Sequence, residues 1–113
     1  MRFISIFTHE ANNRQPTEAE MATMGKLIQE GMKAGWLIAT EGVSFGATGV
    51  RVHKSAGGQV TVTDGPFTET KEVLGGYALL KAETRNEVVA LTRRFLDVVG
   101  QGTCELYQLY EMS

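Results

Sequence analysis

The stretch TEAEMATMGKLIQEGMKAG, residues 17–35, carries a complete set of helix signals. Thr17 and Glu20 form a capping box, in which the threonine hydroxyl accepts from a first-turn amide and the glutamate reaches back. Gly35 can take the left-handed conformation that ends a helix. Four apolar side chains recur near the helical period: Met21, Met24, Ile28 and Met32. These signals predict one amphipathic helix.

The same signals return in TRNEVVALTRRFLDVVG, residues 84–100. Thr84 and Glu87 form the second capping box, and Gly100 is the second glycine stop. The apolar stripe consists of Val88, Leu91, Phe95 and Val98. A second helix is therefore predicted, and the chain is built from two matching halves.

Strand-like runs flank both predicted helices, at residues 2–8, 36–42, 77–82 and 103–110. Between the halves, VRVHK and QVTVT enclose a four-residue turn that ends in two glycines, a pattern typical of a hairpin. The order of these elements predicts an α+β fold: a ferredoxin-like βαβ–hairpin–βαβ chain with an antiparallel sheet. We expect one domain spanning residues 1–113.

The strands are apolar on both sides. Alternate side chains of a strand point to opposite faces, so Phe3 and Phe7 point one way and Ile4 and Ile6 the other. A sheet with one face in water alternates apolar with polar residues, and this one does so poorly. Two helices can cover only one face. We therefore expect a homodimer in which two sheets pack face to face.

Composition and charge restrict the classes of partner. Hydrophobic residues make up 42% of the chain, and its formal net charge is -2, which gives no attraction to nucleic acid or to anionic lipid. Cys104 is the one cysteine in the sequence, so no intrachain disulfide can form, and its strand-like surroundings favour a small buried residue. The apolar run at the N-terminus is too short for a signal peptide. We expect a cytoplasmic protein that binds neither nucleic acid nor membrane.

The segment DGPFTETKEVLGGY, residues 64–77, lies between the hairpin and the second half. Asp64 can hydrogen-bond the backbone two residues on, while Gly65 and Pro66 shape a tight turn. Phe67 would then plug the core beneath that turn. A structural turn residue and a catalytic carboxylate are both compatible with Asp64.

Charged residues and a double glycine follow this turn. A short helical turn beginning near Thr68 would place Glu69 and Glu72 on one side, with Lys71 pointing elsewhere. Paired carboxylates can carry out acid–base chemistry or hold a cation, and a solvated turn with a surface ion pair is the alternative. Gly75–Gly76 lets the backbone approach another group closely.

We interpret the segment as closing one end of a small-molecule cleft between the sheet and the helices. Asp64 is the candidate base, and the candidate ligand contacts are Phe67, Glu69, Lys71, Glu72 and Tyr77. His9 is the candidate catalytic partner because histidine titrates near neutral pH, although a histidine without a role explains it as well. Neither His9 nor His53 has the spacing of a metal ligand, and no cofactor motif is present, so neither a metal nor a cofactor is expected.

The run from Asp64 to Phe67, followed by LGGY at 74–77, resembles the signature of the DGPF family of YCII-related proteins. The resemblance also covers EGV at 41–43 and VRV at 50–52, and it implies a small bacterial protein with the dimeric α+β barrel fold. More distant YCII proteins carry a histidine near the first helix and an aspartate, proposed as a catalytic pair. The start of this helix has no histidine, so that pair is not transferred.

The resemblance leaves three functions open, because one fold supports unrelated chemistries. The first is an enzyme acting on a small molecule without a tightly bound cofactor. The second is a non-catalytic ligand-binding or regulatory module, since family members are often encoded beside sigma-factor genes. The third is a dimerisation scaffold.

Overall fold

The computed structural model describes residues 1–10, 17–44, 49–65, 67 and 73–110. In chain order the elements are β1 (Arg2–Glu10), α1 (Glu18–Ala34), β2 (Leu37–Ser44), β3 (Val50–Lys54), β4 (Val60–Asp64), β5 (Val73–Lys81), α2 (Arg85–Val99) and β6 (Thr103–Gln108). They follow the predicted order of two βαβ halves around a hairpin.

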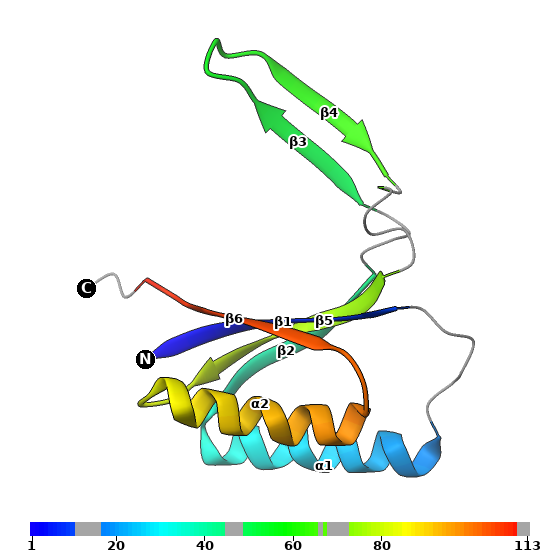
Figure 1. Cartoon of the computed structure of the whole chain (residues 1–113), viewed down its shortest axis with the longest axis vertical. Coiled ribbons are helices and arrows are strands. Elements are labelled where there is room, and N and C mark those ends of the chain that lie inside the picture. Colours follow the sequence, from blue (N-terminus) through cyan, green and yellow to red (C-terminus); the bar gives the residue numbers. More distant parts are fainter. Residues whose placement is uncertain (11–16, 45–48, 66, 68–72, 111–113) are drawn as a thin grey trace.

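Four of these strands form one sheet in the order β2-β5-β1-β6, and each neighbouring pair is antiparallel. Both described helices lie against the same face of this sheet, and the opposite face has no helix over it (Figure 1). This arrangement is the predicted ferredoxin-like α+β fold. The strands β3 and β4 form a separate two-stranded sheet, which we call the arm.

Both predicted capping boxes hold their helices in place. The amide of Glu20 donates to the Thr17 hydroxyl, and the amide of Glu87 donates to the Thr84 hydroxyl, each at 3.1 Å. In the second box the Glu87 carboxylate accepts from the amide of Glu83 at 2.6 Å, one residue before the threonine. Gly35 ends α1 with a φ of 89°, in the left-handed region.

The buried face of α1 differs from the predicted methionine stripe. Met21 and Met32 are 55% and 49% exposed, whereas Ile28 packs against the core and Gly31 is buried. The face of α1 that packs on the sheet is rotated about the helix axis relative to the predicted stripe. Met21 and Met32 therefore lie at the edge of the packed face and are open to solvent. Gly31 makes room for Trp36, since a Cβ at residue 31 would lie 2.7 Å from the indole.

The strand β5 begins at Val73, earlier than the predicted start at Tyr77. Gly75 and Gly76 are therefore strand residues rather than part of a loop. A Cβ on Gly75 would collide with the carbonyl oxygen of Phe7 in β1. A Cβ on Gly76 would lie 2.6 Å from the carbonyl oxygen of Glu41 in β2. Because glycine is depleted in strands, the sequence of Gly75 and Gly76 indicated a loop. In the structure, the missing side chains of these two glycines let β5 pack closely against its neighbouring strands.

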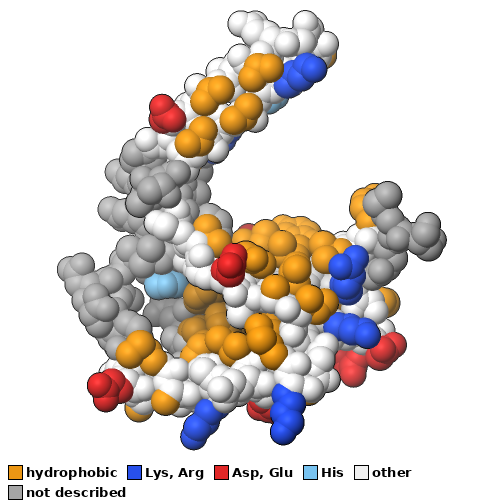
Figure 2. All heavy atoms as spheres, turned by 180° about the vertical axis from the view of Figure 1, so that it is seen from behind, with side chains coloured by type: hydrophobic (Ala, Val, Ile, Leu, Met, Phe, Trp, Pro, Cys, Tyr) orange, Lys and Arg blue, Asp and Glu red, His pale blue; other side chains and the backbone are white. Residues whose placement is uncertain are grey.

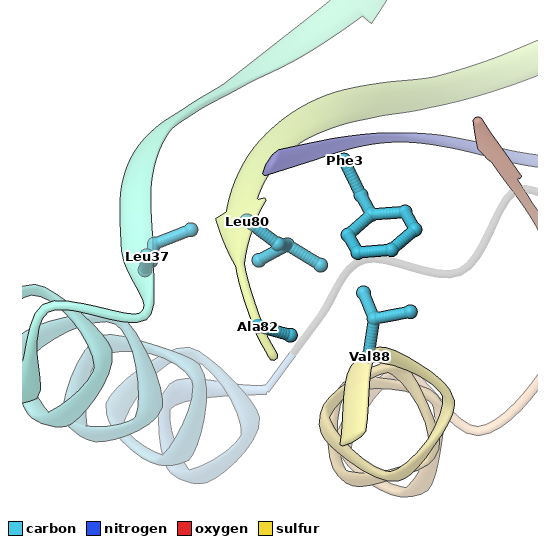
Figure 3. Close-up of a cluster of buried hydrophobic side chains, with 5 residues drawn as sticks. All are labelled: Phe3, Leu37, Leu80, Ala82 and Val88. Atoms are coloured by element: carbon cyan, nitrogen blue, oxygen red, sulfur yellow. The ribbon is translucent and has the colours of Figure 1, made fainter. Parts of the chain in front are cut away.

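The core is a small cluster between the sheet and α2 (Figure 3). Its buried hydrophobic residues, among those described, are Phe3, Leu37, Leu80, Ala82 and Val88. Strand register places Phe3, Leu80 and Leu37 side by side on one face, and Val88 points toward them from α2. Alternation had placed Phe3 on one face and Ile4 on the other, and the helices cover the face that carries Phe3.

Two glycines of α1 provide a matched test of this packing. We expect Gly31→Ala to destabilise the fold by about 1–3 kcal/mol, because the new methyl group would press on Trp36 and on Leu37, whose Cβ lies 2.9 Å away. Gly25→Ala meets nothing within 4 Å and should stabilise the fold by about 1 kcal/mol through helix propensity. Urea denaturation at fixed protein concentration measures both changes, and effects of the same sign would contradict the packing described here.

Candidate functional site

A cavity of about 540 Å³ lies between the helix-covered face of the sheet and the two helices. Strands and helices both contribute apolar walls, chiefly Phe7, Leu27, Ile28, Trp36, Leu91 and Phe95. Cavities of this size accommodate small organic ligands. The cavity lies beside the core cluster, so its position follows from how the helices pack on the sheet.

The floor of the cavity is open because two strand positions lack side chains. Register aligns Phe7 with Gly76, and Gly76 with Gly42, across β1, β5 and β2. Phe7 therefore faces two glycines on the helix-covered side. Phe95 from α2 packs edge-on against the Phe7 ring at 5.0 Å between centroids, which supports one wall.

The serine and threonine residues that line this mostly apolar cavity contribute three hydroxyl groups, those of Ser5, Thr40 and Thr92. Ser5 and Thr92 are only 6% and 7% exposed. The Thr92 hydroxyl donates to the Val88 carbonyl at 2.8 Å, and the Thr40 hydroxyl donates to the Tyr77 carbonyl at 2.9 Å. Their protons are thus used within the protein, while oxygen lone pairs stay able to accept a hydrogen bond.

Ser5 also forms a side-chain hydrogen bond with Cys104. Burial raises the pKa of the Cys104 thiol above its ordinary value, and the hydrogen bond from Ser5 opposes that rise only in part. A thiol with a raised pKa is a poor nucleophile at neutral pH, which agrees with its interpretation as a structural residue.

The sequence analysis did not identify Ser5, Thr40 or Thr92 as site residues. A signal was present for two of them. Ser5 falls between Phe3 and Phe7 on the same face of an apolar strand, and Thr92 lies one residue after Leu91 on an apolar helix face. A hydroxyl at such a position must find a partner in the interior, and here both groups border the cavity.

The first described residues of the DGPF segment close the base of the arm. The amide of Gly65 donates to the carbonyl of Gly49 at 2.6 Å, and a Cβ on Gly65 would lie 2.8 Å from that oxygen. The Arg51 guanidinium stacks 4.0 Å from the centroid of the Phe67 ring. Phe67 is half-buried and packs on Arg51, so the prediction that it plugs the core is wrong.

Comparison with family models gives a match to the YCII-related domain over residues 1–113. The chain belongs to the YCII-related family. The comparison with curated proteins gives no match. The family membership agrees with the resemblance of the DGPF segment, and the cavity of this YCII-related protein is the feature from which its chemistry must be argued.

Two predicted site residues of this YCII-related protein lie close to the cavity. His9 lies in β1, and its ring is 5.3 Å from that of Phe7, which forms part of the cavity wall. Tyr77 contributes to the lining, while register places it beside Ile6 and Glu41 on the opposite face. The Tyr77 hydroxyl donates to the Glu41 carboxylate at 3.0 Å.

The remaining predicted site residues lie elsewhere. Asp64 is exposed at the end of β4, paired with Val50, and is not among the residues that line the cavity. Its role as a base stays a prediction. Glu69, Lys71 and Glu72 lie outside the described residues, as does the helical turn predicted near Thr68.

Within the described ranges, no group of three or more histidine, cysteine, aspartate or glutamate side chains could hold a metal ion. In the same part of the chain, no helix is both long and apolar enough to span a bilayer.

The Tyr77–Glu41 hydrogen bond predicts a specific titration. The bond to the Glu41 carboxylate raises the pKa of Tyr77 above its ordinary 10.0, so its contribution to stability is present below pH 10.0 and is lost as pH rises through the folded pKa. In Glu41→Gln the pKa of Tyr77 should fall, which ¹³C NMR of the tyrosine ring carbons can follow.

Glu105→Gln is the matched control for this titration. The Tyr107 hydroxyl donates to Glu105 at 2.6 Å, and this bond raises the pKa of Tyr107 in the same way. The control should lower the pKa of Tyr107 and leave that of Tyr77 unchanged. An unchanged Tyr77 titration in Glu41→Gln would show that the hydrogen bond does not form in solution.

Proposed function

We propose that this YCII-related protein binds a small organic molecule in the cavity between its sheet and its helices. The observation that carries the proposal is a volume of about 540 Å³ enclosed mainly by apolar walls and a few hydroxyl groups. Glu41 is the charged residue among the described lining, and its carboxylate accepts from Tyr77, beside which register places it on the opposite face of the sheet. Burying an unpaired charge in such surroundings is costly, so the ligand is uncharged and largely apolar. No lysine, arginine or histidine is among the described residues that line the cavity, which disfavours an anionic ligand.

The hydroxyl groups restrict the ligand further. Thr40 and Thr92 donate to backbone carbonyls, so they offer acceptor lone pairs to the cavity. A ligand with a hydrogen-bond donor, such as a phenol hydroxyl, complements these acceptors. A flat aromatic ring would also suit the walls provided by Phe7, Trp36 and Phe95.

Turnover of the ligand is a second candidate function, favoured by the contact between His9 and Phe7. Histidine is a common general acid or base, and one beside the cavity wall is placed to exchange a proton with a bound molecule. Asp64 remains the proposed base of this alternative, although it lies on the arm. Binding without conversion would instead support the ligand-binding or regulatory module that the family resemblance implies.

We also propose that the protein acts as a face-to-face homodimer. The sheet face without helices carries Ile4, Ile6, Leu79 and Tyr107, and Tyr107 is 52% exposed. The chain exposes 8426 Å² of surface, whereas a compact monomer of this length exposes about 6100 Å². A second sheet packed on this face would bury the apolar side chains that the helices cannot reach.

Ligand binding can be tested by filling the cavity. Ala78 lines the sheet floor and packs against the core, so Ala78→Leu inserts volume where the ligand would lie. We expect this change to weaken binding of 1-naphthol, measured by calorimetry, by about tenfold or more. Ala34→Leu makes the same substitution at an exposed position of α1 and should leave affinity unchanged.

Naphthalene serves as the matched probe because it lacks the hydroxyl, and we expect it to bind more weakly than 1-naphthol. Chromatography of the recovered probe distinguishes binding from turnover, and conversion lost in His9→Gln would favour the enzyme. The cavity is not a ligand site for molecules of this class if neither probe binds the unmodified protein. The same conclusion follows if each probe binds Ala78→Leu as tightly as it binds the unmodified protein.

The homodimer can be tested by placing a charge on the uncovered sheet face. Ile4 lies between Leu79 and Tyr107 on that face, so Ile4→Lys would bury an ammonium group in the proposed interface. Sedimentation equilibrium should show a dimer for the unmodified protein and a monomer for the variant. Met32→Lys, on the exposed surface of α1, should stay dimeric. A monomeric unmodified protein would overturn the proposal.

A further inference from the structure

The two faces of the arm differ in chemistry. Register pairs Val52 with Val62, so four valines lie on one face: Val50, Val52, Val60 and Val62. Lys54, paired with Val60, and Asp64, paired with Val50, lie at the two ends of the same face. The four valines are 57%, 66%, 57% and 63% exposed, respectively. The other face carries Arg51, His53, Thr61 and Thr63. We call the first of these the valine face.

The arm is a regular hairpin that is closed at both ends. At its tip, the amides of Ser55 and Gln59 bond to the Gln59 carbonyl and to the Ser55 hydroxyl, at 2.8 and 3.1 Å. At its base, the Gly65–Gly49 bond and the Arg51–Phe67 stack hold the two strands. An isolated two-stranded hairpin is marginally stable in water, and one that exposes four valines needs a cover.

The arm leaves the body on the side of the sheet that the helices do not cover (Figure 1). Its projection raises the radius of gyration to 16.4 Å, against about 13 Å for a compact domain of this length. Figure 2 shows apolar side chains along the arm and a second apolar patch on the body below it, with open space between them. The arm is therefore on the same side of the molecule as the proposed dimer interface.

We propose that the valine face of the arm packs against a second copy of this chain, so that each subunit of the dimer holds its partner. The inference rests on the proposed face-to-face dimer and extends it to a part of the chain outside the sheet. A twofold axis through the sheet interface would bring both arms onto partner subunits at once.

The surface area supports a second copy as the occupant. The chain exposes 8426 Å², which exceeds the value for a compact monomer by roughly 2300 Å². Each subunit thus has ample uncovered surface for the large interfaces of obligate homodimers, which bury about 2000–5000 Å² in total. The arm and the uncovered sheet face lie on the same side of the molecule (Figure 1), so a separate partner protein on the arm would have to bind beside the second subunit.

The test compares two double variants of the arm. Val52→Thr with Val62→Thr keeps the shape and the β-branching of the valine face but adds hydroxyl groups. We expect the dimer dissociation constant, from sedimentation equilibrium, to rise roughly 100-fold, because four apolar contacts per dimer are weakened. Thr61→Val with Thr63→Val makes the reverse change on the opposite face and should leave the constant unchanged.

Amide hydrogen exchange provides the second measurement. In the unmodified dimer the arm amides should exchange slowly, and in the Ile4→Lys monomer they should exchange fast although the arm sequence is unaltered. Equal exchange in both states would overturn the proposal, and so would a dissociation constant that the valine substitutions leave unchanged. A complex of four chains that the valine substitutions reduce to two would place the valine face between dimers, which overturns the proposed contact within the dimer.

These outcomes separate the inference from the dimer on which it depends. If Ile4→Lys gives a monomer while the valine variants stay dimeric, the sheet interface stands and the role of the arm fails. If the unmodified protein is itself a monomer, both fail. Fast exchange of the arm amides in an intact dimer would contradict the proposal, because the arm would then be uncovered and left to a different partner.

Discussion

The close approach of β5 to β1 and β2 at Gly75 and Gly76 is the constraint on which the rest of the structure depends. Neither position tolerates a Cβ, because backbone carbonyls of Phe7 and Glu41 occupy the space. The register set there aligns Phe3 with Leu80 at the other end of the sheet. The core and the floor of the cavity are therefore consequences of one tightly packed central strand.

A single covered face explains why the core is so small. Among the described residues, Val88 alone has a fully buried side chain of any size, at 1% exposure. The helices contact one side of the sheet, while Ile4, Ile6 and Tyr107 belong to the other. Because the hydrophobic effect scales with the apolar area removed from water, a fold with one covered face gains about half of what its strands could provide. The proposed second copy would provide the remainder.

The described residues of the DGPF segment have structural roles at both of its ends. Its first residues end β4 and close the base of the arm, through Gly65 and through the stack of Arg51 on Phe67. Its last residues lie in β5 and help to form the cavity floor. The segment thus connects the part of the chain proposed to hold a partner with the part proposed to hold a ligand.

Local signals predicted the elements of this fold well. Capping boxes at Thr17 and Thr84, glycine stops and the turn at 55–58 depend on neighbouring residues only, and the structure confirms them. The start of β5 was predicted too late because glycine signals a loop locally, whereas here it serves strand packing. Phe67 was assigned to the core because an aromatic residue after a turn is usually buried, but Arg51 from the facing strand provides its partner.

The sequence by itself determined the order of strands and helices, the alternation of the sheet faces and the family to which the chain belongs. Only the tertiary structure decided where the cavity lies and which hydroxyls line it. Ser5, Thr40 and Thr92 are far apart in the chain, and they converge because β1, β2 and α2 pack around the same space. Local preferences act over a few residues, whereas a site depends on contacts across the whole chain, which form only when the layers pack.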